Sequence, residues 1–61
     1  MKAEISDWLC GQVEAINKLA LSVQLTVGVH DANAAAELME VRFACNRVTV
    51  RLKEAAEAEK E

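Results

Sequence analysis

The chain has one segment rich in turn-forming residues, and that segment lies at its midpoint. Residues 28–33 read GVHDAN, and the rest of the 61-residue chain contains one other glycine, Gly11, and no proline. A β-rich fold of this length needs several tight turns, and tight turns draw on Gly, Pro, Asn and Asp. A single central turn therefore favours two long helical arms over a sheet.

Both arms have the apolar periodicity of a helix. Apolar residues recur at spacings of three and four, which places them on one helical face. In the second arm this stripe contains Ala34, Leu38, Val41, Cys45, Val48, Leu52 and Ala55. In the first arm it contains Ile5, Leu9, Val13, Ile16, Ala20, Val23 and Val27. Asp31 or Asn33 is placed to cap the start of the second helix with its side-chain oxygen.

These stripes predict an all-α fold, an antiparallel two-helix hairpin. We expect the first helix at about 3–27, a turn at 28–32 and the second helix at about 33–58, in one domain over residues 1–61. Two helices that face each other along their stripes form the interior of such a hairpin.

A small α/β fold is the alternative. Apolar and polar residues alternate near 21–29 and near 47–52, and both segments are rich in β-branched residues, which is typical of strands. Two isolated strands, however, would have unprotected edges and little to pack against. The helical hairpin is therefore the favoured interpretation.

A chain of this size buries little surface, and a lone small core rarely supplies more than roughly 3–5 kcal/mol. Cys10 and Cys45 are too few for a disulfide framework, so self-association is the expected reinforcement. We expect two hairpins to form a four-helix bundle as a homodimer. Apolar residues outside the main stripes predict an outer patch that serves as a dimer or partner interface: Leu21, Leu25, Met39, Phe43 and Val50.

Four cations lie within twelve residues that contain no acid: Arg42, Arg47, Arg51 and Lys53. They are candidate contacts to an anionic partner, either a nucleic-acid backbone or an acidic protein surface. The favoured interpretation is ion pairing within the chain or between subunits, because Glu4, Asp7 and Glu14 would lie at the same end of the hairpin. A net charge of -3 also argues against a general polyanion binder.

No catalytic motif is recognisable, so we expect no enzyme, no cofactor and no metal. The chain has no glycine-rich phosphate loop, and its one histidine, His30, stands beside Asp31 without further ligands nearby in the sequence. No apolar run is long enough to span a membrane, and no segment resembles a signal peptide, which predicts a cytoplasmic protein. The sequence thus predicts a small acidic, non-enzymatic interaction or regulatory module that binds a partner protein as a homodimer. A nucleic-acid-binding regulator is the alternative.

Overall fold

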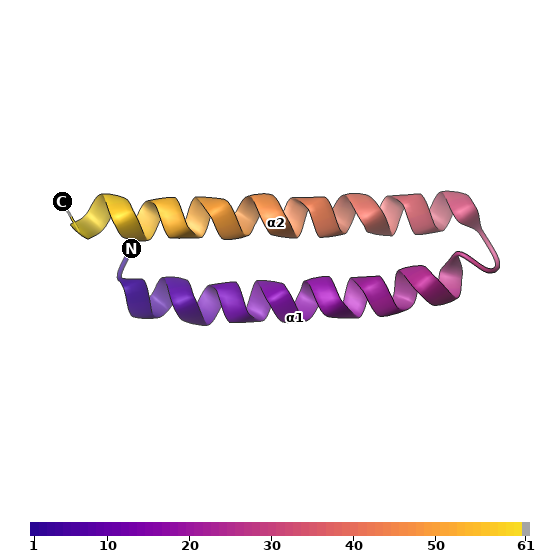
Figure 1. Ribbon diagram of the computed structural model, residues 1–61, viewed down its shortest axis with the longest axis horizontal. Helices are drawn as coiled ribbons and strands as arrows, with labels where there is room; N and C mark the ends of the chain where they lie inside the picture. Colours follow the sequence, from indigo (N-terminus) through magenta and orange to yellow (C-terminus); the bar gives the residue numbers. More distant parts are fainter. Residues whose placement is uncertain (61) are drawn as a thin grey trace.

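Two long helices make up nearly the whole molecule (Figure 1). The computed structural model describes residues 1–60, with α1 at Ala3–Val27 and α2 at Ala32–Lys60. The helices run antiparallel, and both termini lie at the end opposite the connecting loop. The Cα atoms extend over 49 by 15 by 8 Å, so the hairpin is a flat rod with two broad faces. The all-α helical hairpin predicted from the sequence is confirmed.

The segments in which apolar and polar residues alternate are helical and not extended. Residues 21–27 form the end of α1, residues 47–52 lie within α2, and residues 1–60 contain no strand. Thr26 and Thr49 each donate a hydroxyl hydrogen bond to the carbonyl four residues earlier, at 3.3 and 3.1 Å. This bond gives a β-branched polar side chain a partner inside a helix. The α/β alternative is therefore wrong.

A short loop at residues 28–31 reverses the chain. The N–H of Gly28 donates to the carbonyl of Gln24 at 2.9 Å, and a Cβ at Gly28 would lie 3.1 Å from that same oxygen. The backbone angles of Gly28 are right-handed helical, so they do not themselves require glycine. Glycine suits this position because a larger residue would bring its Cβ close to that oxygen. Oδ1 of Asp31 accepts hydrogen bonds from the N–H groups two and three residues later, at 3.0 and 3.2 Å. Asp31 is thus the cap of α2, as the sequence pattern indicated.

The two helices meet through small side chains. Ser6, Ala20, Cys45 and Ala56 are the buried residues among those described. Around them, half-buried residues continue the line of contact, which we call the seam. On α1 the seam contains Ser6, Leu9, Val13, Asn17, Ala20, Gln24 and Val27, and on α2 it contains Leu38, Arg42, Cys45, Thr49, Leu52 and Ala56. Small residues allow two helix axes to approach closely, and bulky neighbours then flank the contact.

The seam differs from the apolar stripes that the sequence predicts. Five β-branched residues expected inside the hairpin are 42–53% exposed: Ile5, Ile16, Val23, Val41 and Val48. Each helix is rotated so that polar residues take their places, including Asn17, Gln24 and Arg42. Asn17 and Gln24 have hydrogen-bond partners there, because both accept from Arg42 across the gap between the helices. The seam keeps part of each predicted stripe, namely Leu9, Val13, Ala20 and Val27 of the first and Leu38, Cys45 and Leu52 of the second.

Candidate interaction surface

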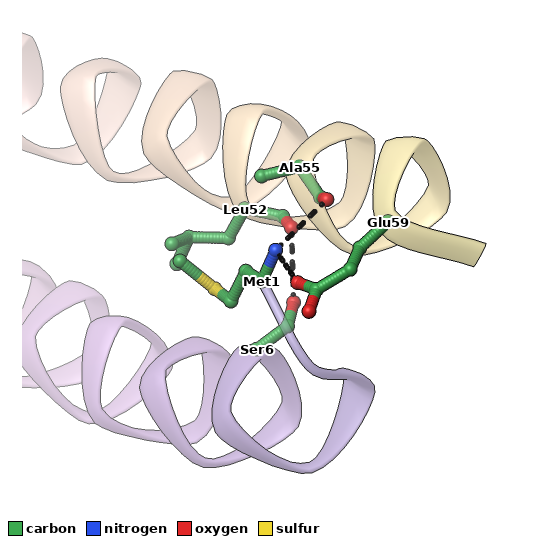
Figure 2. A network of polar contacts seen from close by, with 5 residues as sticks. All are labelled: Met1, Ser6, Leu52, Ala55 and Glu59. Atoms are coloured by element: carbon green, nitrogen blue, oxygen red, sulfur yellow. Dashed lines mark hydrogen bonds and ion pairs between the residues drawn. The ribbon is translucent and has the colours of Figure 1, made fainter. Parts of the chain in front are cut away.

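Hydrogen bonds and an ion pair tie the open end of the hairpin together (Figure 2). Oγ of Ser6 donates to the carbonyl of Leu52 at 3.0 Å. The amino group of Met1 donates to the carbonyl of Ala55 at 3.4 Å and forms an ion pair with the carboxylate of Glu59. The loop joins the helices at one end, and these contacts join them at the other.

Arg42 forms the central polar contact of the seam. Its Nε donates to Oδ1 of Asn17 at 3.0 Å, and its Nη1 donates to Oε1 of Gln24 at 3.2 Å. Nδ2 of Asn17 donates in turn to Oδ1 of Asn46 at 3.2 Å. Each bond crosses from one helix to the other. Because two of its donors are used inside the hairpin, Arg42 is separated in role from the other three cations of the predicted cluster.

The remaining cations of that cluster are exposed and lie at two different places on α2. Arg47 and Arg51 lie with Val50 and Glu54 around a shallow depression on α2, whereas Lys53 borders a hollow between the helices. Within residues 1–60, none of the three forms the expected intramolecular ion pair with an acid of the first helix. Glu14 instead pairs with Lys18 on its own helix at 3.4 Å, and ion pairing of these cations between subunits stays a prediction.

All five residues of the predicted outer patch are exposed, with exposed fractions of 37–67%. Each follows a seam residue by one position, as Leu21 follows Ala20 and Phe43 follows Arg42. In two antiparallel helices, positions that follow the seam by one point to the same broad side. We call this side the Phe43 face, and its apolar residues are Leu21, Leu25, Met39, Phe43 and Val50.

The opposite side contains a larger apolar surface, which sequence reasoning missed. Its residues each precede a seam residue by one position, as Trp8 precedes Leu9 and Val41 precedes Arg42. We call it the Trp8 face, and its large apolar residues, all 42–67% exposed, are Ile5, Trp8, Ile16, Leu19, Val23, Val41 and Val48. Small and polar seam residues recur at multiples of seven residues, as in Arg42, Thr49 and Ala56. This recurrence, and not the apolar periodicity, indicates which residues lie on the Trp8 face.

The two broad faces differ in charge. Charged residues that follow the seam by one position, and so lie on the Phe43 face, are Asp7, Glu14, Lys18, Lys53 and Glu57. Among the positions that precede the seam by one, which lie on the Trp8 face, the charged residues are Glu37 and Arg51, and both are on α2. The α1 half of the Trp8 face therefore has no charge, whereas the Phe43 face combines an apolar half near the loop with a polar half near the termini.

A hollow occupies the polar half of the Phe43 face. The residues that line it include Cys10, Gly11, Asn46 and Val50. A Cβ added to Gly11 would meet nothing within 4 Å, so no close packing inside the chain requires this glycine. Asp7, Glu14 and Lys53 also border the hollow.

Neither metal binding nor membrane crossing is indicated in the described part of the chain. No group of three or more His, Cys, Asp or Glu side chains in residues 1–60 is arranged to hold a metal ion. Asp31, which stands beside His30, uses its carboxylate to cap α2. Over the same residues, neither helix combines the length and apolar character that a membrane span requires.

Comparison of the chain with protein-family models, with curated proteins and with solved structures found no match.

Proposed function

We propose that this chain is a small non-enzymatic interaction module of the cytoplasm, which acts through its helix faces as a homodimer and binds a partner protein. One observation supports this most strongly: large apolar side chains lie on both broad faces, while the seam buries only Ser6, Ala20, Cys45 and Ala56 among the described residues. Contiguous exposed apolar surface on a small protein marks an interaction site.

Two faces allow two roles. A homodimer uses one face for the second copy and leaves the other available, and the Phe43 face is the proposed site for the partner protein. Its apolar half, with Leu21, Leu25, Met39 and Phe43, adjoins a polar half, which is the usual composition of a partner-binding surface with an apolar centre and a polar rim.

Sedimentation equilibrium and circular dichroism across protein concentration test self-association. We expect the mass to rise from one chain to two with increasing concentration, and the helical signal to rise with it, because dimer formation stabilises the helices. A fully helical species that keeps the mass of one chain at the highest attainable concentration would contradict the homodimer.

The alternative function, nucleic-acid binding through Arg42, Arg47, Arg51 and Lys53, has weaker support. Arg42 donates to acceptors inside the hairpin, and the other three do not share one side. Titration of the wild type and Arg47→Glu with DNA and RNA at low salt tests it. We expect no binding from either; wild-type binding that weakens with salt and is lost in Arg47→Glu would favour this alternative over the proposed function.

A further inference from the structure

The Trp8 face has a symmetric pattern of residues along α2. In chain order, its positions hold Glu37, Val41, Ala44, Val48 and Arg51. Glu37 lies seven residues before Ala44 and Arg51 lies seven residues after it, so the pattern reads acid, valine, alanine, valine, base. Reversing the direction of such a helix exchanges the positions of the acid and the base. A second copy that lies antiparallel across Ala44 therefore places Arg51 opposite Glu37, twice by symmetry.

The same axis passes through the middle of α1. Asn17 is hydrogen-bonded to Arg42 and to Asn46, so it lies level with Ala44. Its neighbour Ile16 is on the Trp8 face, 53% exposed. A two-fold axis at this level brings Ile16 against Ile16 of the second copy. The rest of the α1 half, from Ile5 to Val23, then meets an equally uncharged surface, with the loops at opposite ends.

From this arrangement we infer that the Trp8 face binds a second copy of the chain, antiparallel, with α1 on α1 and α2 on α2, and with ion pairs between Glu37 of each copy and Arg51 of the other. The inference rests on the proposed homodimer and specifies its surface and register.

The other two-fold arrangement of these faces stacks α1 on α2. Glu37 would then lie against the uncharged stripe of α1 and have no cation to pair with, which is costly for a charge removed from water. In residues 1–60, neither Glu37 nor Arg51 forms an ion pair within its own chain, so both carboxylate and guanidinium are available to a second copy. Charge complementarity thus selects the antiparallel register.

The size of the face fits a dimer. A stable interface covers roughly 800 Å² on each partner. One broad face measures 49 by 15 Å between Cα atoms, and side chains widen it further. Because the face extends over the length of both helices and has a single charged pair on each copy, a second copy covers the exposed Trp8, Ile16 and Leu19 together.

A matched pair of substitutions on α1 tests which face the second copy uses. Leu19 and Leu25 are both 67% exposed, six residues apart on one helix, but on opposite broad faces. We expect Leu19→Glu to raise the dimer dissociation constant by about 100-fold or more, since the charge is buried twice in each dimer. Leu25→Glu is the control, and we expect it to stay within about threefold of the wild type in sedimentation equilibrium.

The outcomes separate this inference from the proposed function. If Leu25→Glu dissociates the dimer and Leu19→Glu does not, the second copy binds the Phe43 face, so this inference fails while the homodimer stands. If the wild type itself is a monomer, both fail.

Charge exchange tests the register without adding a charge to an apolar site. Glu37→Arg and Arg51→Glu each place like charges opposite one another, and we expect each to weaken dimerisation by about tenfold over the two symmetric pairs. The double variant restores opposite charges, and its dissociation constant should return to within about threefold of the wild type. A double variant that dimerises no better than either single one would overturn the antiparallel register.

Discussion

Ser6, Asn17 and Arg42 lie between the two helices, whereas Trp8, Leu19 and Phe43 lie on the broad faces outside. The fully buried residues inside are small, and polar side chains hydrogen-bond among the half-buried ones, whereas the largest exposed apolar side chains lie outside. In a globular domain of ordinary size the apolar side chains are the ones inside. The difference shows that much apolar surface stays exposed on the single chain, and burial of that surface is the stabilisation that the proposed association would add.

The largest effect on a single chain is expected at the small buried residues of the seam. Ala20→Leu adds bulk at a buried seam position that is 7% exposed, and overpacking of this kind costs about 1–3 kcal/mol of unfolding free energy. Urea denaturation at one fixed protein concentration measures it. The matched change Ala36→Leu, at an exposed position of α2, should stay within about 0.5 kcal/mol of the wild type. Equal losses of unfolding free energy in the two variants would mean that the seam has room for a larger side chain at residue 20.

The polar contact of the seam is expected to have the next largest effect. Arg42→Ala removes both hydrogen bonds to α1 and leaves the side-chain oxygens of Asn17 and Gln24 without these donors, at a cost of about 1–2 kcal/mol. Arg47→Ala, an exposed arginine on the same helix, is the control and should cost less than about 0.5 kcal/mol. If the denaturation curves of the two variants coincide, Arg42 contributes no more to the unfolding free energy than a surface arginine does.

The smallest effect concerns the two glycines and has the opposite sign. Gly11→Ala should raise the unfolding free energy by about 0.5–1 kcal/mol, because alanine favours the helix and its Cβ meets nothing within 4 Å. Gly28→Ala should gain less, since its Cβ would lie 3.1 Å from the carbonyl oxygen of Gln24. Thermal denaturation of both variants, with helicity monitored, makes the comparison. A loss of stability in Gly11→Ala would indicate that the hollow beside Gly11 is filled when chains associate.

The fold follows from local features of the sequence. One turn segment at the midpoint and helical periodicity on both sides leave an antiparallel hairpin as the favoured fold, and Asp31 marks the start of the second helix. The alternation at residues 47–52 favours a strand only locally. Helical backbone on both sides of this segment, packed against α1 through Cys45 and Leu52, outweighs that preference.

Apolar periodicity identifies only part of the seam, because each helix has more apolar residues than one face can hold. Periodicity selects the stripe with the most apolar residues, but two chain segments pack where their backbones can approach. A second signal is present in the numbering: Asn17 lies eleven residues before Gly28, and Arg42 lies eleven residues after Asp31. Folding at the turn brings them level, so a search for polar pairs at equal distance from the turn finds this contact. The pattern of acid, valine, alanine, valine and base around Ala44 can be recognised only once the seam is known, because the seam defines which residues share the Trp8 face.

The bonds of Arg42 also govern how far one helix can slide along the other. Its guanidinium reaches two acceptors seven residues apart on α1, and displacing α2 by a single turn, about 5.4 Å, would break both at once. The two helices are consequently either aligned with both bonds formed or shifted with both bonds broken. Residues inserted in the connecting loop would therefore lengthen the loop without shifting one helix along the other. The arrangement of side chains on the two broad faces would be kept, whereas a purely apolar contact would allow the helices to slide.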